Sequence, residues 1–315
     1  METIMDVLIN IIISTLEEGL MYALMAMGIY ITYSILDFPD LSVDGTMPLG
    51  AVATGILILH GVNPWLCLIL SFIIGAAAGF ITGLLHVKLG IRPLLCGILV
   101  YTALLSVNLV ILLLFNNGAS VAAFFTKPTI FNTLFASLIP QTMFGFNLRC
   151  LIVSLILVII CKIILDLFLK TRCGLLLRAT GDNTQFVTML AKDPGISKIL
   201  GLMIGNGFAA LAGSVIAQSK GSADQQMGVG MVVLGLASVI IGISIFKKLS
   251  FMKATTMVIL GSIVYKACLS IALALGLPTE YLKLLMAVIF TLALVFSGHE
   301  TKHSSKKGGV HRVKA

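Results

Sequence analysis

The sequence predicts an all-α polytopic membrane protein, and three observations predict this fold class. Hydrophobic residues make up 58% of the 315 residues, and charged residues only 11%. The mean hydropathy of +1.09 exceeds what a water-soluble domain needs to fill its core. Apolar segments of about 20 residues, the length of one helical crossing, occupy most of the chain. We therefore expect a single bundle of about nine spans, with no stretch left for a separate enzymatic domain.

Polar and Pro/Gly-containing connections separate the apolar segments and set their expected boundaries. The predicted spans are 19–36, 45–60, 66–86, 94–115, 148–169, 201–217, 228–246, 254–276 and 281–298. Residues 1–18 form an apolar, weakly amphipathic segment that either lies on the membrane surface or extends the first span. Residues 19–298 form the transmembrane domain. Residues 299–315 form a basic tail that we expect to be solvated near anionic lipid.

Lys and Arg are distributed unequally between the connections, which predicts the orientation in the membrane. With 86–93, 170–200, 247–253 and 299–315 on one side, that side holds fifteen Lys and Arg residues. The other side holds four, namely Lys127, Arg149, Lys220 and Lys283. The richer side is predicted to be cytoplasmic, so the N-terminus lies outside and the C-terminus inside. The net charge of +8 reflects this asymmetry and does not indicate a nucleic-acid partner.

A polar break interrupts the apolar sequence at residues 37–46 and is the first candidate functional element. Asp37, Asp40 and Asp44 are three of the thirteen carboxylates, and they lie within eight residues. Carboxylates inside a membrane are costly, so they usually face protein or a water-filled path. A Pro/Gly break between apolar half-segments is typical of the discontinuous helices of transporters. The candidate solute-pathway residues are Asp40, Ser42, Asp44, Thr46 and, in the 94–115 span, Asn108.

Two of these residues also have simpler interpretations. Asp44 could cap the half-helix that starts at Gly45. Asn108 could make an ordinary hydrogen bond between helices.

A buried Lys266 in the 254–276 span needs a partner, and Asp40 or Asp44 could supply it.

Small residues recur at four-residue spacing in two spans, which lets helices approach closely in lipid. One stripe is Gly75, Gly79 and Gly83, and the other is Gly201, Gly205, Ala209 and Gly213. Packing within the chain is the main interpretation, and a dimer interface is the alternative. Residues 45–50 and 230–235 also show a short similarity in spans of opposite direction, as in an inverted repeat.

The cytoplasmic connection 170–200 contains a short amphipathic helix. Asp182 or Asn183 can cap its start, and Pro194-Gly195 is expected to end it. Its apolar face consists of Phe186, Val187, Met189 and Leu190. Such a helix docks into a soluble partner or lies on the lipid surface, and the pattern favours neither.

Motifs for chemistry by this chain are absent from the sequence. It has no G-x-x-x-x-G-K-[ST], H-E-x-x-H, G-x-S-x-G or C-x-x-C motif, so we expect neither a bound cofactor nor a metal site. The six cysteines are scattered along the chain and are expected to be free thiols.

Four stretches resemble the permease subunits of type II ABC importers, of the branched-chain amino acid/ribose permease type. The stretches are residues 19–28, 38–50, 88–99 and 178–183. The second reads F-P-D-L-S-V-D-G-T-M-P-L-G, and it is similar to the family's F-x-D-L-[ST]-V-D-G-x-x-x-L-G. The fourth, R-A-T-G-D-N, resembles the family's R-A-x-G-x-N loop. Pro39 stands where relatives often carry a small residue. Within the family, the chain looks closest to permeases of tryptophan/tyrosine-type binding-protein systems.

The resemblance implies partners and a mechanism. Two permease copies would form the path, and two cytoplasmic ATPases would bind ATP and Mg²⁺. An extracytoplasmic binding protein, often a lipoprotein, would deliver the solute for import. The helix after Gly181 would be the coupling helix that contacts the ATPase. The implied coupling residues are Arg178, Ala179, Gly181, Asp182, Asn183, Phe186, Met189 and Leu190. The implied solute is small and polar, such as an amino acid, aromatic ones included, a sugar or a nucleoside.

Two rival functions remain open on the sequence. An ion- or proton-coupled secondary transporter would use Asp37, Asp40 and Asp44 as a relay, and Asp44→Asn would then stop coupling. An intramembrane aspartyl protease would lose activity on Asp40→Asn, although the sequence has no second matching Asp motif. For the importer, we expect Asp182→Lys or Gly181→Arg to abolish transport in a protein that still folds.

Overall fold

The structure is a computed structural model, and it describes residues 4–133, 148–247, 249, 252–278 and 281–307. Side chains are described from residue 9 to residue 295 within these ranges. The tail residues 308–315 and part of the 116–147 connection, residues 134–147, lie outside the described residues.

The described chain is almost entirely helical, which confirms the predicted fold class. The long helices are α1 (Ile4–Ile29), α2 (Val43–Leu59), α3 (Pro64–Val87), α4 (Pro93–Phe115), α6 (Arg149–Phe168), α9 (Pro194–Lys220), α10 (Met231–Phe246), α11 (Ala254–Ala274) and α12 (Leu282–Lys307). Within the described ranges, seven helices are long and apolar enough to cross a membrane, and the segments Val43–Leu59 and Leu282–Val295 are shorter apolar helices. Each of the nine predicted spans corresponds to one of these helices.

Helix α1 begins at Ile4 and continues without a break past residue 18, so the described part of the N-terminal segment belongs to this helix. It ends in a π-helical turn, η1 (Tyr30–Ile35). At the other end of the chain, α12 continues to Lys307, beyond the predicted end of the span at residue 298.

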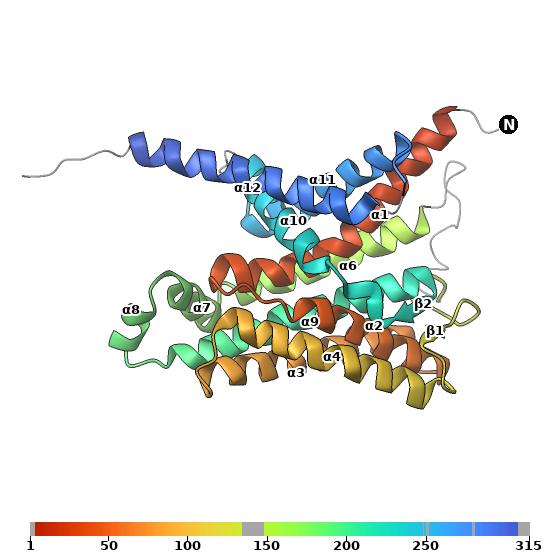
Figure 1. Cartoon of the computed structure of the whole chain (residues 1–315), viewed down its shortest axis with the longest axis horizontal. Helices are drawn as coiled ribbons and strands as arrows, with labels where there is room; N and C mark the ends of the chain where they lie inside the picture. Colours follow the sequence, from red (N-terminus) through yellow and green to blue (C-terminus); the bar gives the residue numbers. More distant parts are fainter. Residues whose placement is uncertain (1–3, 134–147, 248, 250–251, 279–280, 308–315) are drawn as a thin grey trace, which may run out of the picture.

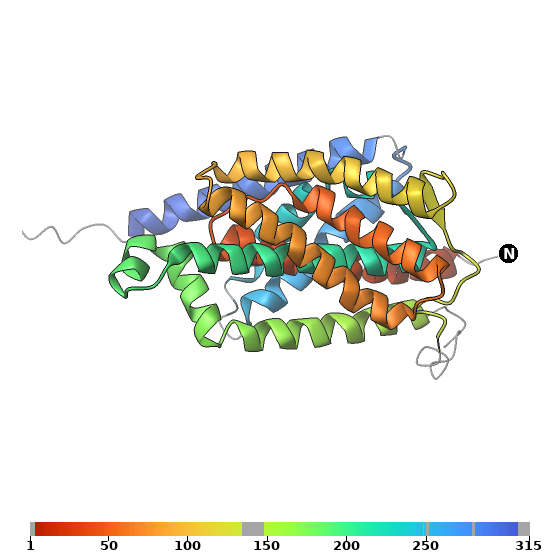
Figure 2. The same cartoon turned by 90° about the horizontal axis from the view of Figure 1, so that it is seen from below.

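The centre of the bundle is α9, which packs against α1, α2 and α3 (Figures 1 and 2). Its small residues allow this. A Cβ atom added to Gly75 would overlap Ala210, one added to Gly79 would overlap the Leu202 backbone, and one added to Gly83 would lie 2.9 Å from the Ile199 Cα. The second stripe packs on other helices of the chain, since a Cβ atom on Gly205 would overlap Thr32 and one on Gly213 would overlap the Met47 carbonyl oxygen. Both small-residue stripes therefore pack against helices of the same chain. Buried hydrogen bonds also join α3 to α9. One of them is donated by Ser71 Oγ to the Ala210 carbonyl at 2.7 Å.

The two ends of the bundle differ (Figure 1). One end carries the short helices α7 (Arg172–Asp182) and α8 (Thr184–Met189), and we call it the α8 end. The opposite end carries an antiparallel two-stranded ladder, and we call it the β end. The ladder joins β1 (Val121–Ala123) to β2 (Ser222–Asp224), which the sequence analysis did not predict. After β2, the 3₁₀ turn η2 (Gln225–Gly228) leads into α10.

Lys266 corrects one prediction. Its Nζ donates to Glu18 on α1 and lies 4.5 Å from the centre of the Tyr22 ring. Asp40 and Asp44 are therefore not its partners. Helices α1 and α11 pack side by side, and this brings together residues that are 248 positions apart in the sequence.

Candidate functional site

The predicted break lies between η1 and α2, and its backbone departs from helical geometry in two ways. The Leu36 N–H donates to the Ile31 carbonyl and the Phe38 N–H to the Thr32 carbonyl, which lengthens the hydrogen-bond spacing beyond that of an α-helix. Asp37 then adopts a left-handed φ of 52°, which is uncommon for a residue other than glycine. The Phe38 ring packs edge-on against His86 of α3, with 5.1 Å between the ring centres.

A buried hydrogen-bond network organises the polar residues of the break around Asn206 of α9. Asn206 Nδ2 donates to Asp40 Oδ2 at 2.7 Å, and the Ser42 and Thr46 hydroxyls donate to Asn206 Oδ1 at 3.0 and 2.8 Å. The other Asp40 oxygen accepts the Ser42 backbone N–H at 2.9 Å. Thr82 of α3 adds a longer bond to Ser42 Oγ. This network ties the break to α9 and α3.

The burial of these side chains shows whether the network is open to solvent or closed. Asp40 is 5% exposed, and Ser42, Thr46 and Asn206 are fully buried. Their polar atoms satisfy one another, as buried polar groups must. The network is thus closed here and does not line an open cavity. The sequence analysis missed Asn206, although a lone amide within the small-residue stripe of the 201–217 span was a signal.

Asp44 caps a helix, but a different helix from the one expected. Its Oδ1 accepts the Val232 N–H at 2.7 Å, and its Oδ2 accepts the Gly230 N–H at 3.2 Å. These donors belong to the N-terminus of α10, whereas the N-cap of α2 is Ser42. A carboxylate there satisfies orphan amides and complements the helix dipole. The two half-segments with similar sequence, 45–50 and 230–235, therefore meet at Asp44.

Asn108 of α4 is fully buried, and its Nδ2 donates to the Gly45 carbonyl at 3.1 Å. Its Oδ1 has no hydrogen-bond partner within the described residues. The helix–helix interpretation of Asn108 accounts for the donor but not for the acceptor.

The 170–200 connection contains two helices, α7 and α8, where the sequence predicted one. Asn183 caps α8 by accepting the Phe186 N–H at 3.1 Å. Helix α8 ends at Met189, and Ala191 follows with a φ of 56°. Pro194 begins α9 and does not terminate α8, because proline suits the first turn of a helix.

Helix α8 and the residue that follows it expose three large apolar side chains, beside the exposed polar residues Thr184, Gln185 and Thr188. Val187 is buried, while Phe186, Met189 and Leu190 are 52%, 82% and 54% exposed. Arg178, Asp182 and Asn183 are also exposed, and Ala179 is half-buried.

Gly181 connects this loop to the break. A Cβ atom on Gly181 would overlap the Ile35 carbonyl oxygen and lie 3.2 Å from the Leu36 Cα. The backbones are thus in direct contact at the end of η1. This corrects the expectation that Gly181→Arg leaves the fold intact, because any side chain there displaces η1.

The site as a whole is a continuous set of contacts. It runs from α8 and α7 through Gly181 to η1, then through the Asp40–Asn206 network to α2, and through Asp44 to α10. Chemically, it is a set of hydrogen bonds and close backbone contacts between separate helices. Such an arrangement can transmit a displacement at one end of the bundle to a helix terminus inside it.

Comparison with known proteins shows the family to which the chain belongs. The family model described as branched-chain amino acid transport system / permease component matches residues 11–294. A tyrosine transport system permease protein of Clostridioides difficile (strain R20291) is 42% identical over 288 residues, 91% of each chain. An uncharacterized protein of Rickettsia prowazekii (strain Madrid E) is 34% identical and covers 90% of this chain and 97% of its own length.

A more distant relative is also described as an amino-acid transport permease. The probable branched-chain amino acid transport permease protein LivH of Methanocaldococcus jannaschii is 29% identical over 64% of this chain and 65% of its own length. No solved structure matches the chain.

Proposed function

The chain belongs to the branched-chain amino acid transport system permease family of ABC importers, and we propose that it moves an amino acid across the membrane, driven by ATP hydrolysis in separate subunits. The observation that carries this proposal is the match over residues 11–294, together with 42% identity to a tyrosine transport permease. Aromatic amino acids are therefore the first solutes to test. ATP and Mg²⁺ would bind to the partner ATPase and not to this chain.

The ATPase would dock on α8. An apolar surface that is exposed at the end of a membrane protein is typical of a protein contact. Phe186, Met189 and Leu190 supply that surface, and Asp182 and Arg178 border it in the sequence. The α8 end would then be cytoplasmic, with the N-terminus of the chain outside. An extracytoplasmic binding protein would deliver the solute at the β end, and a second permease copy would complete the path.

The break would respond to the ATPase. Gly181 contacts the last turn of η1, so a shift of α7 and α8 would press on the segment that holds Asp40. In the closed network Asp40, Ser42 and Thr46 are bonded to Asn206, and opening it would expose these groups toward the solute path. Asp44 of α2, bonded to the start of α10, and Asn108 of α4 would support the same path.

Of the three carboxylates in the relay of the rival secondary transporter, Asp40 and Asp44 have structural roles in this structure. Asp44 is bonded to two backbone amides, and Asp40 to an amide side chain and a backbone N–H. Protonation of either carboxylate would weaken these hydrogen bonds, most of which join separate segments of the chain.

Co-purification tests the proposal. The chain is extracted from its native membrane in mild detergent, and the eluate is examined for a P-loop ATPase. We expect such a subunit to co-purify and to be lost from Met189→Asp, because Met189 is 82% exposed and a carboxylate there would face the apolar cleft of the partner. Radiolabelled amino-acid uptake is measured in cells that express the same variants.

The matched control is Phe125→Asp, an equally drastic change at a side chain that is 72% exposed at the β end. It should retain the ATPase. A chain that is stable and active without any ATPase, and driven by an ion gradient in proteoliposomes, would contradict the proposal.

A further inference from the structure

A groove of about 680 Å³ opens at the β end, between η2, the start of α10 and the start of α12. We call it the β-end groove, and the residues that matter to its chemistry are Lys220, Asp224, Met227, Met231, Lys283 and Met286. Its volume lies within the range of about 300–1,000 Å³ that is common for small-molecule sites.

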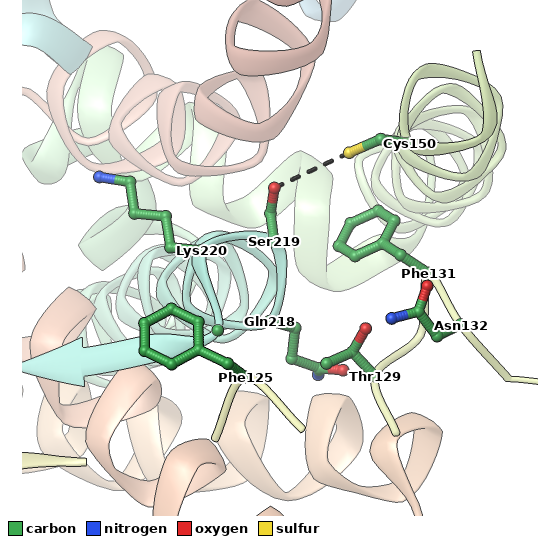
Figure 3. A pocket seen from close by; sticks show the side chains of 9 residues that line it. Phe125, Thr129, Phe131, Asn132, Cys150, Gln218, Ser219 and Lys220 are labelled. Carbon is green, nitrogen blue, oxygen red and sulfur yellow. Dashed lines mark hydrogen bonds between the residues drawn. The ribbon is translucent and has the colours of Figure 1, made fainter. Parts of the chain in front are cut away.

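Positive charge is concentrated in this groove. Only four Lys and Arg residues are predicted on this side of the membrane, and two of them, Lys220 and Lys283, line it. Neither lysine forms an ion pair with any side chain in the described part of the chain. Figure 3 shows the Lys220 side chain extending away from Cys150, Phe131 and Asn132 of a smaller neighbouring pocket. Two lysines without counter-ions are suited to hold a carboxylate.

One carboxylate lies in the same groove. Asp224 Oδ1 accepts the Gln226 N–H at 2.7 Å, which fixes the side chain at the start of η2. Its Oδ2 has no hydrogen-bond partner among the described residues. The groove therefore carries both signs of charge, and a zwitterion matches it better than a simple anion does.

Three methionines supply the apolar part. Met227, Met231 and Met286 come from three different elements and are all partly exposed. Thioether sulfur makes favourable contacts with aromatic rings, and flexible Met side chains adapt to their shape. The groove is thus suited to a planar ring.

The groove also borders the start of α10, which Asp44 caps. Met231 lies between Gly230 and Val232, whose N–H groups bind Asp44. A molecule in the groove would lie next to the junction of α2 and α10. By contrast, the smaller pocket of about 240 Å³ in Figure 3 has its buried amide already engaged, since Gln218 Oε1 accepts the Ile130 N–H at 2.9 Å.

We propose that the β-end groove is a binding site for a zwitterionic amino acid with an aromatic side chain. Lys220 and Lys283 bind its carboxylate, Asp224 binds its ammonium group, and the methionines contact its ring. This inference rests on the proposed transport function and adds to it a recognition site within the permease itself.

Equilibrium binding of tritiated L-tyrosine to the purified full chain in phosphatidylcholine nanodiscs tests the inference. We expect unlabelled L-tyrosine to compete, and tyramine, N-acetyl-L-tyrosine and L-alanine to compete poorly, because each lacks one recognised group. Lys283→Gln and Asp224→Asn should each raise the Kd about tenfold or more. Asn keeps the Oδ1 acceptor for Gln226, so this variant should still fold.

Lys127→Gln is the matched control, since Lys127 is an exposed lysine predicted on the same side and does not line the groove. It should leave the Kd unchanged, and all variants should unfold at the wild-type temperature. Unchanged Kd values in Lys283→Gln and Asp224→Asn would overturn the site.

Cellular uptake measurements distinguish a failure of the proposed groove site from a failure of the transport proposal. If wild-type cells take up tyrosine but the purified chain does not bind it, the groove is not a solute site and the transport proposal stands. Uptake lost in Lys283→Gln without any tyrosine binding to the wild-type chain would indicate contact with the delivering protein instead, and would also overturn the site. If no amino-acid uptake depends on the chain, the transport proposal itself fails.

Discussion

At the scale of single residues, Asp44 shows how an intramembrane carboxylate can be tolerated. It is half-buried, and its oxygens accept N–H groups from two residues at the start of α10. Two backbone donors and the positive end of a helix dipole replace the water that a carboxylate would otherwise need. The same hydrogen bonds that offset the burial of this charge also connect α2 to α10.

Asp44→Ala should destabilise the purified chain by about 1–3 kcal/mol, because it removes a cap and leaves amides of α10 unsatisfied. Asp44→Asn keeps one oxygen acceptor, so it should cost about 1 kcal/mol or less and retain amino-acid uptake. Unfolding by SDS titration measures the stability. Uptake abolished in Asp44→Asn at unchanged stability would contradict the capping role and favour a titrating one.

Asn206 illustrates a different residue-scale effect. One amide side chain binds Asp40 through Nδ2 and the Ser42 and Thr46 hydroxyls through Oδ1. An amide has both donors and acceptors, so it can bridge a carboxylate and two hydroxyls without carrying a charge. That property explains why a neutral residue is the hub of this network.

At the scale of elements, close packing of α3 on α9 depends on residues without side chains. Gly75, Gly79 and Gly83 lie on one face of α3, and their Cα atoms lie against the α9 backbone. In lipid, where exclusion of water does not drive helix association, such close contacts supply the packing energy.

Gly79→Val should therefore destabilise the chain by about 1–3 kcal/mol, because its side chain would overlap the Leu202 carbonyl. Ala77→Val on the same helix is the matched control, since Ala77 is exposed and should change stability by about 0.5 kcal/mol or less. Thermal unfolding of both variants in detergent checks this. Equal unfolding temperatures would show that α3 and α9 are not packed as closely as described.

The contact between the break and the α7–α8 connection also belongs to the scale of elements. The contact between Gly181 and Ile35 joins a surface loop to the end of η1 without any side-chain bond. Rigid backbone contact transmits a displacement better than a long flexible side chain does, which suits a coupling role.

At the scale of the whole molecule, the two ends have distinct surfaces. The α8 end exposes three large apolar side chains, Phe186, Met189 and Leu190, and the β end presents the ladder and a charged groove. The Lys and Arg distribution predicts the α8 end to be cytoplasmic. The proposed ATPase would contact that side, and the proposed binding protein would contact the other.

Thiol labelling measures this orientation. Cys173 is exposed on α7, so it is first replaced by Ser. We then expect Gln185→Cys to react with a membrane-impermeant maleimide only from the cytoplasmic side, and Lys127→Cys only from outside. Both positions are exposed in the structure. Labelling of Gln185→Cys in intact cells would contradict this orientation and show that the α8 end lies outside.

The spans, the break and the amphipathic loop could all be predicted from the sequence, because each is a local property. Hydropathy over about 20 residues decides what enters the bilayer, and proline or glycine acts on its own turn. Asp40, Ser42 and Thr46 could be singled out for the same reason. Their partner Asn206 could not, because it is 166 residues from Asp40.

The sequence by itself determined that the chain is a polytopic helical membrane protein with a polar break and a short amphipathic segment in the 170–200 connection. Only the tertiary structure decided which helix Asp44 caps, that Lys266 pairs with Glu18, and that β1 pairs with β2. It also decided that Lys220, Asp224 and Lys283 share one groove. These pairings join residues up to 248 positions apart, and the sequence between them imposes no distance. The packing of whole helices on α9 and α1 brings them together.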